Sequence, residues 1–156
     1  MDQDYEPPSD FLKAIIRDEV PFIGSFGDAN VARLIEMTRD PDRANRDWAT
    51  LLLAQLERGA TEVTEALLAA AADEDEYVRA EAILGVAQRE PSLALPLIRA
   101  ALQEENVCLP IFEAAAVVAH PSLIDSLRDF TDGEDHIDQL ARDALAACEA
   151  GQAIRV

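Results

Sequence analysis

A repeat with a period of about 30 residues constrains the fold of this 156-residue chain more than any other feature of its sequence. Residues 40–42 (Asp-Pro-Asp) align with residues 73–75 (Asp-Glu-Asp), and residues 91–93 (Pro-Ser-Leu) recur unchanged as residues 121–123. A repeat of this length is typical of solenoids, in which each unit buries its apolar face against the next unit. Four copies would occupy roughly residues 29–150.

Each copy has the pattern of two helices joined by an acidic turn. In the second copy an Ala- and Leu-rich segment at residues 65–72 precedes the turn, and apolar residues follow it at mixed spacings of three and four. Asp73, Glu74 and Asp75 form that turn, and a carboxylate there can cap the next helix by accepting its free N–H groups. No convincing strand pattern interrupts the helices, so we predict an all-α fold of two stacked helical layers.

Local signals place several boundaries. Ser9 is a predicted N-cap for a short helix over residues 10–18. Pro91 is expected at the start of a first helix, and the next second helix should begin near Pro110, because an interior proline costs about 3 kcal/mol. We divide the chain into a flexible acidic N-terminus (1–8), a capping helix with an apolar loop (9–28), a repeat domain (29–150) and a C-terminal tail (151–156).

A recurring motif carries a family resemblance. The second copy reads Asp73-x-Asp75-x-x-Val78-Arg79-x-x-Ala82-x-x-Gly85, and the first reads, less fully, Asp40-x-Asp42-x-x-x-Arg46-x-x-Ala49. This pattern resembles the HEAT-like repeats, in the short form found in bacterial proteins and in phycobilin lyase subunits. The resemblance implies a short right-handed α-solenoid of about four helix pairs behind an N-terminal capping helix.

The resemblance also implies a ladder of contacts between neighbouring repeats, made by the turn Asp and by the Arg six positions later. Its members here would be Asp40, Arg46, Asp73 and Arg79. In the third copy Gln103 and Leu109 occupy these positions, and in the fourth copy Asp132 and Asp138 do so. We therefore expect the ladder to fail toward the C-terminus, where the fourth copy would act as a capping repeat.

Net charge restricts the possible partners. The chain has 13 basic and 31 acidic side chains, a formal charge of −18. Such a surface repels phosphate backbones and anionic lipids, so direct nucleic-acid and membrane binding are not expected. The first ten residues are acidic and lack the basic-then-apolar order of a signal peptide, so none is expected. No apolar run is long enough for a membrane-spanning helix, and the two cysteines are isolated. We expect a cytoplasmic protein in a reducing compartment.

No group of residues in the sequence has the pattern of a catalytic or metal site. His120 and His136 are far apart and are expected at structural or surface positions. Cys108 takes the place of Val78 in the repeat, which predicts a buried small side chain and not an activated thiolate, and Cys148 lies in the last predicted helix. The acidic turns lack the ligand spacing of a calcium loop. We expect no catalysis, no cofactor and no metal.

The acidic turns become more informative when the repeats are stacked, because equivalent turns would then lie along one edge. Such an edge would concentrate negative potential and steer a basic partner. The alternative is that helix capping and solubility alone explain these acids. The candidate partner-binding residues are Arg46, Trp48, Asp73, Glu74, Asp75, Glu76, Glu104, Glu105, Asp132, Glu134 and Asp135.

Two apolar features have alternative interpretations. The loop at residues 20–27 contains Phe22, Ile23 and Phe26, which we expect to fold over the open end of the first repeat; otherwise they form a contact patch. Trp48, the only tryptophan, takes the place of Glu81 in the next copy. If Glu81 faces solvent, Trp48 is a partly exposed interface anchor beside Arg46; otherwise it is a core residue at the end of the solenoid.

The favoured function is a non-catalytic binding module that engages another, possibly basic, protein. One alternative is an acidic inhibitor of the immunity or antitoxin type, directed against a basic nuclease-like toxin. Another is a lyase-type chromophore handler, which only the analogy with bilin lyases supports. The sequence does not specify the oligomeric state.

Overall fold

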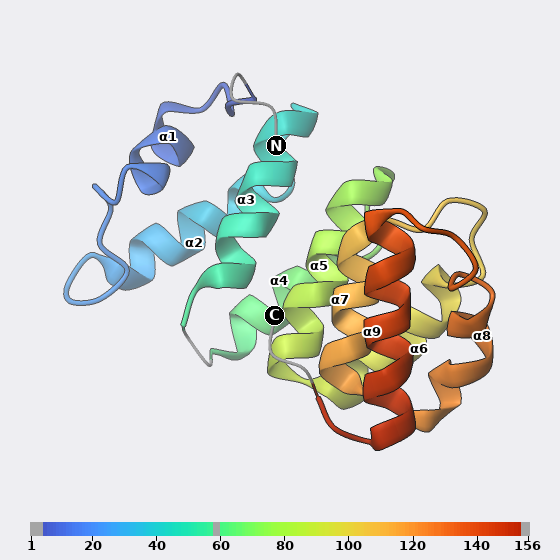
Figure 1. Cartoon of the computed structure of the whole chain (residues 1–156). Helices are drawn as coiled ribbons and strands as arrows, with labels where there is room; N and C mark the ends of the chain where they lie inside the picture. Colours follow the sequence, from blue (N-terminus) through green and yellow to red (C-terminus); the bar gives the residue numbers. More distant parts are fainter. Residues whose placement is uncertain (1–4, 58–59, 154–156) are drawn as a thin grey trace.

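The computed structural model describes residues 5–57 and 60–153, and these residues form helices and turns without a strand. The predicted N-terminal and C-terminal segments fall partly outside these ranges. Figure 1 shows the order of the helices along the chain. Their bounds are α1 (Asp10–Ile16), α2 (Gly27–Met37), α3 (Arg43–Gln55), α4 (Thr61–Ala70), α5 (Glu76–Arg89), α6 (Pro91–Ala101), α7 (Leu109–Val118), the 3-10 helix η1 (Pro121–Leu123), α8 (Ile124–Arg128) and α9 (His136–Ala150).

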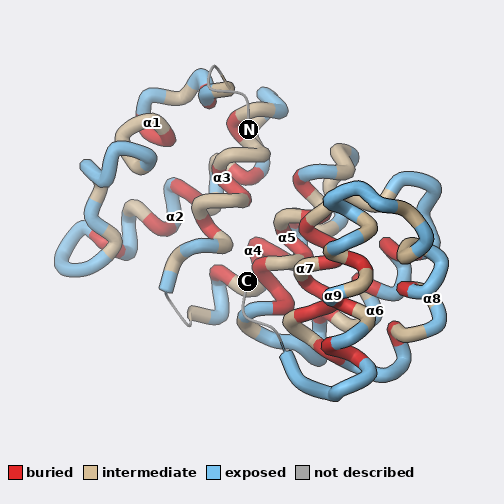
Figure 2. Tube along the Cα trace, in the orientation of Figure 1, coloured by how far each residue is buried: buried red, intermediate tan, exposed pale blue. Residues whose placement is uncertain are grey.

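The second helices of the four repeats form one continuous row. Helix α3 packs against α5, α5 against α7, and α7 against α9, while α2, α4, α6 and α8 each pack against the second helix of their own repeat. Buried residues recur where helices face one another, and the connecting turns are exposed (Figure 2). This arrangement confirms the predicted all-α solenoid of paired helices.

The helix starts follow local chemistry closely. Ser9 accepts a hydrogen bond from the Leu12 N–H, and Asp75 accepts from the N–H groups of Tyr77 and Val78. Pro91 is the first residue of α6, and Pro110 lies at the second position of α7, as expected. Helix α1 ends at Ile16, before the predicted residue 18, because Asp18 has a φ of 60° that cannot continue a helix.

Small side chains let the row of second helices pack closely. Gly85 of α5 lies where a Cβ atom would stand 2.8 Å from the Ala54 Cβ of α3 and 3.1 Å from a Leu67 methyl of α4. Ala49 and Ala82 are completely buried in the same two helices of the row. Close approach of three helices at one point therefore requires glycine at position 85.

Two expectations about burial are wrong. Cys108 is only half-buried because α7 begins at Leu109, which leaves the cysteine at the N-cap and outside the core-facing part of the helix. The apolar loop before α2 does not fold over the first repeat as a whole. Phe22 packs partly against the core, but Ile23 is 87% exposed and Phe26 is 72% exposed.

The contact around Gly85 gives the first prediction. Gly85→Ala should lower the free energy of unfolding by about 1–3 kcal/mol, because the added methyl must displace Ala54 or Leu67, although alanine is the better helix former. Urea denaturation measures this change. The control is Gln88→Ala on the exposed side of α5, which should change the free energy of unfolding by less than about 0.5 kcal/mol. A Gly85→Ala protein as stable as wild type would contradict the close approach.

Candidate functional site

All four second helices begin at the same end of the molecule, the upper end in Figure 1. The turns that precede them therefore bring their acidic residues to one edge, which we call the turn edge. It comprises residues 40, 42, 73–76, 104, 105, 132, 134 and 135.

Arginines of the second helices tie part of this edge together. The Arg46 guanidinium lies 3.0 Å from Asp73 Oδ2 and 3.4 Å from Glu74 Oε1, so it joins the first repeat to the second. It also donates to the main-chain carbonyls of Asp40 and Pro41. With Arg46 only 12% and Asp73 only 11% exposed, this pair is shielded from water and holds the two turns together.

Arg79 repeats this arrangement one unit along the chain. It donates to the main-chain carbonyls of Asp73 and Glu74, and its guanidinium lies 3.4 Å from Glu104 Oε2. The inter-repeat contacts thus continue into the third copy, where we had expected them to fail. Its acceptor is Glu104, which aligns with Glu74, and not Gln103, which aligns with Asp73.

The fourth repeat keeps only the main-chain part of the arrangement. Arg142 donates to the carbonyls of Thr131 and Gly133, holding the last acidic turn against α9. Because Arg142 lies four residues beyond the repeat position held by Asp138, the motif spacing could not reveal it.

Not every acid at the turn edge is paired equally. Asp75 accepts from Arg43 at 2.8 Å, and this charged hydrogen bond lowers the pKa of its carboxyl group, although burial opposes the shift. Glu74 is 88% exposed despite its contact with Arg46. Others point to solvent, namely Glu105, Asp132, Glu134 and Asp135.

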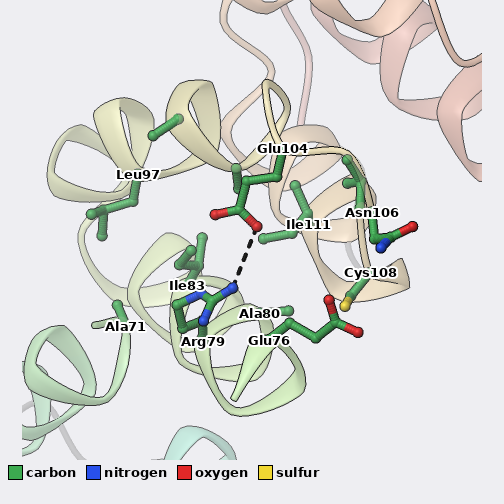
Figure 3. Close-up of a pocket in the computed structure, with 13 residues that line it drawn as sticks. Ala71, Glu76, Arg79, Ala80, Ile83, Leu97, Glu104, Asn106, Cys108 and Ile111 are labelled. Atoms are coloured by element: carbon green, nitrogen blue, oxygen red, sulfur yellow. Dashed lines mark hydrogen bonds and ion pairs between the residues drawn. The ribbon is translucent and has the colours of Figure 1, made fainter. Parts of the chain in front are cut away.

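A small cavity of about 100 Å³ lies behind the turn edge, between α5, α6 and the start of α7 (Figure 3). The Arg79–Glu104 ion pair lies among the residues that line it, and the Cys108 sulfur lies beside the Glu76 carboxylate. Burial and the neighbouring Glu76 raise the pKa of the Cys108 thiol. This cysteine is therefore protonated near neutral pH and is a poor nucleophile.

A second hollow, of about 160 Å³, opens on the second helices and is lined by Tyr5, Asp47, Trp48, Leu51, Tyr77 and Glu81. We call it the aromatic groove. Tyr5 stacks on Trp48 with ring centroids 6.0 Å apart and donates a hydrogen bond to Asp47. Of the aromatic residues in this groove, the sequence indicated Trp48 alone. Trp48 is half-buried, which is intermediate between the exposed anchor and the core residue that were the two alternatives. The sequence missed Tyr5, because Tyr5 is far from the repeats in sequence.

Glu81 lines this groove and also borders a neighbouring hollow of about 300 Å³, where Glu113 of α7 lies. Burial, reinforced by Asp47 and Glu113, raises the pKa of Glu81 to about 7. Burial also raises the pKa of Glu113. Within residues 5–57 and 60–153, neither carboxylate has a hydrogen bond or an ion pair. Glu81 is partly desolvated without compensation, whereas nearby His136 partly opposes the rise in the pKa of Glu113.

Stacked helix pairs with arginine-linked turns define this protein as an α-solenoid of short helical repeats. A family model described as HEAT repeats matches residues 30–119, more than half of the chain. The chain therefore belongs to the HEAT-repeat family. No curated protein matches it.

The described part of the chain lacks two features. No helix there is long and apolar enough to cross a membrane. In the same residues, no three or more His, Cys, Asp or Glu side chains gather in a way that could hold a metal ion.

The arginines at the turn edge should differ in their contribution to stability. Arg46→Met should lower the free energy of unfolding by about 2–4 kcal/mol, because it leaves the shielded Asp73 carboxylate without a cation and with one main-chain hydrogen bond, from the Asp75 N–H. The matched variant Arg43→Met should cost less than about 1 kcal/mol, since Arg43 is exposed and Asp75 keeps its main-chain hydrogen bonds. Chemical denaturation measures the free energy of unfolding of both variants. Equal losses would show that the Arg46 pair contributes no more to stability than the Arg43 pair.

Glu81 should make stability fall as pH rises. Its folded-state pKa lies above the ordinary value of 4.5, so the folded protein keeps a proton that the unfolded chain releases. Between about pH 4.5 and pH 7 this difference should remove on the order of 2 kcal/mol from the free energy of unfolding. Glu81→Gln should flatten that slope in denaturation curves measured across this range. An unchanged slope in the variant would assign the pH dependence to other groups.

Proposed function

We propose that this protein is a non-catalytic binding module whose turn edge engages a basic surface of another protein. HEAT repeats generally mediate protein–protein interactions, which supports a partner of this class. The net charge of −18 favours a basic partner and disfavours nucleic acid.

The observation that carries this proposal is that some acids of the turn edge are paired with arginines while others are exposed. Asp73 and Asp75 are held by Arg46 and Arg43 and serve the fold. The exposed carboxylates at residues 74, 105, 132, 134 and 135 extend past them along the same edge. Capping accounts for Asp75 and Asp135, but it does not account for Glu105 or Glu134, nor for Glu74, which is 88% exposed despite its contact with Arg46. These three acids are therefore available to a partner.

The hollows also favour binding over catalysis. The lining of the aromatic groove offers aromatic faces and carboxylates, without a Ser, Cys, His or Lys that could act beside Glu81. The raised pKa values of Cys108 and Cys148, both caused mainly by burial, leave these thiols unactivated.

Charge reversal at the turn edge tests the proposal. Glu74→Lys combined with Glu105→Lys should slow association with a basic protein captured from the native cell by about tenfold at low salt, and raised salt should diminish the difference. Glu62→Lys combined with Glu149→Lys is the matched control, because it changes the net charge equally through exposed residues away from the turns. Association rates from surface plasmon resonance distinguish the two pairs. Equal slowing in both would show that only the overall charge matters.

A further inference from the structure

We propose that the aromatic groove is a specific subsite for one arginine side chain of the partner protein. The inference rests on the proposed function and deepens it, because the groove lies next to the turn edge. It assigns a recognition role to Tyr5, Trp48, Tyr77 and Glu81 that is separate from the long-range steering by exposed acids.

The walls of the groove come from successive repeats. Trp48 and Leu51 lie on one face of α3, and Tyr77 and Glu81 lie four residues apart on one face of α5. Tyr5 reaches this face from the N-terminal segment and stacks on Trp48. The result is a hollow whose sides are aromatic rings and whose polar groups are carboxylates.

This combination selects a cation with a flat, weakly hydrated head. Aromatic faces attract a cation through their quadrupole, and the planar guanidinium can stack on a ring while its N–H groups reach a carboxylate. Lysine offers a compact ammonium that is more strongly hydrated and cannot stack in this way. Glu81 has no partner among the described residues, so an incoming guanidinium would compensate a desolvated carboxylate that the fold leaves unpaired.

The chain itself uses the same chemistry at the rim of the groove. The guanidinium of Arg43 lies 5.8 Å from the centroid of the Tyr77 ring, bonds to Asp75 at 2.8 Å and donates to the Tyr5 hydroxyl at 3.1 Å. One guanidinium is thus already held between an aromatic ring and a carboxylate here. The groove offers a second position between an aromatic ring and a carboxylate, beside Trp48 and Glu81, and no arginine or lysine among the described residues lines it.

The neighbouring hollow extends the site along the second helices. Leu51 and Glu81 belong to both hollows, and the further one continues to Leu109, Pro110 and Glu113 of α7. A peptide segment could therefore place its arginine beside Glu81 and continue toward Glu113, a second partly desolvated acid, which has His136 nearby. A second copy of this chain is a poor occupant, because each copy carries a net charge of −18.

Titration with a defined peptide tests the inference on the full chain. The probe is a fluorophore-free peptide of alternating glycine and arginine with four arginines, and its controls replace arginine by lysine or by neutral, nearly isosteric citrulline. Trp48 is the only tryptophan, so its fluorescence and its single indole N–H resonance report on the groove directly. The arginine peptide should shift both signals, the lysine peptide should bind at least about fivefold more weakly, and the citrulline peptide should not bind.

Two variants that each remove one negative charge separate the groove from general electrostatics. Glu81→Gln should lower the affinity for the arginine peptide at least about tenfold. Glu74→Gln, at the exposed turn edge, should lower that affinity less than about twofold. Glu81→Gln removes an unpaired, partly buried charge, so a folding defect is not expected. Equal weakening by both variants, or binding without a change in the Trp48 signals, would overturn the inference.

The pH dependence of binding gives an independent readout. Wild-type affinity should rise between about pH 6 and pH 8, because the guanidinium binds the ionised carboxylate, and Glu81→Gln should abolish most of that rise. The other acids that face Glu81 are Asp47 from α3 and Glu113 from α7. Slower association for the double variant at residues 74 and 105, together with wild-type affinity for Glu81→Gln, would leave the turn edge intact as a binding surface and reject the groove.

Discussion

The close approach of the second helices is the constraint on which the other features of this structure depend. At Gly85 the backbone of α5 comes so near to Ala54 of α3 and Leu67 of α4 that no side chain fits. Buried alanines such as Ala49 and Ala82 maintain the same short separation along these helices. Because the helices stack directly and run in the same direction, their starts share one edge and their outer sides form one continuous surface (Figure 1).

The arginines at the shared edge give its acids two different roles. Arg46 and Arg79 each hold the main-chain carbonyls of their own turn and a carboxylate of the next repeat. The shielded pair of Arg46 and Asp73 helps to fix the spacing of the first two repeats, because such an ion pair breaks only at a cost, whereas the Arg79–Glu104 pair is more exposed. The acids that project beyond these pairs add little to stability, so they can serve solubility and recognition. The same acidic turn sequences therefore supply both the ion pairs between neighbouring repeats and the negatively charged turn edge.

Local chemistry was predictable because each signal acts within a few residues. The carboxylate of Asp75 and the hydroxyl of Ser9 cap helices that start immediately after them, and Pro91 starts a helix that needs no N–H there. The repeat register was less reliable where a helix start had shifted. Cys108 aligns with buried Val78, but the later start of α7 places it at a half-buried N-cap. The ladder was expected to fail at Gln103, but Arg79 pairs with the next residue, Glu104. Exposed Ile23 and Phe26 show that apolar composition alone does not bury a loop.

The sequence by itself determined the repeat period, the helical class, most helix starts and the large negative charge, because periodicity, capping and composition are properties of the chain alone. Only the tertiary structure decided which acids are paired and which are free, because pairing depends on the distance between turns about 30 residues apart. It also decided that Tyr5, Trp48, Tyr77 and Glu81 line one hollow. Their meeting, and the raised pKa of Glu81 that follows from burial there, requires the α3–α5 contact and the return of the N-terminal segment onto α3, neither of which any local pattern encodes.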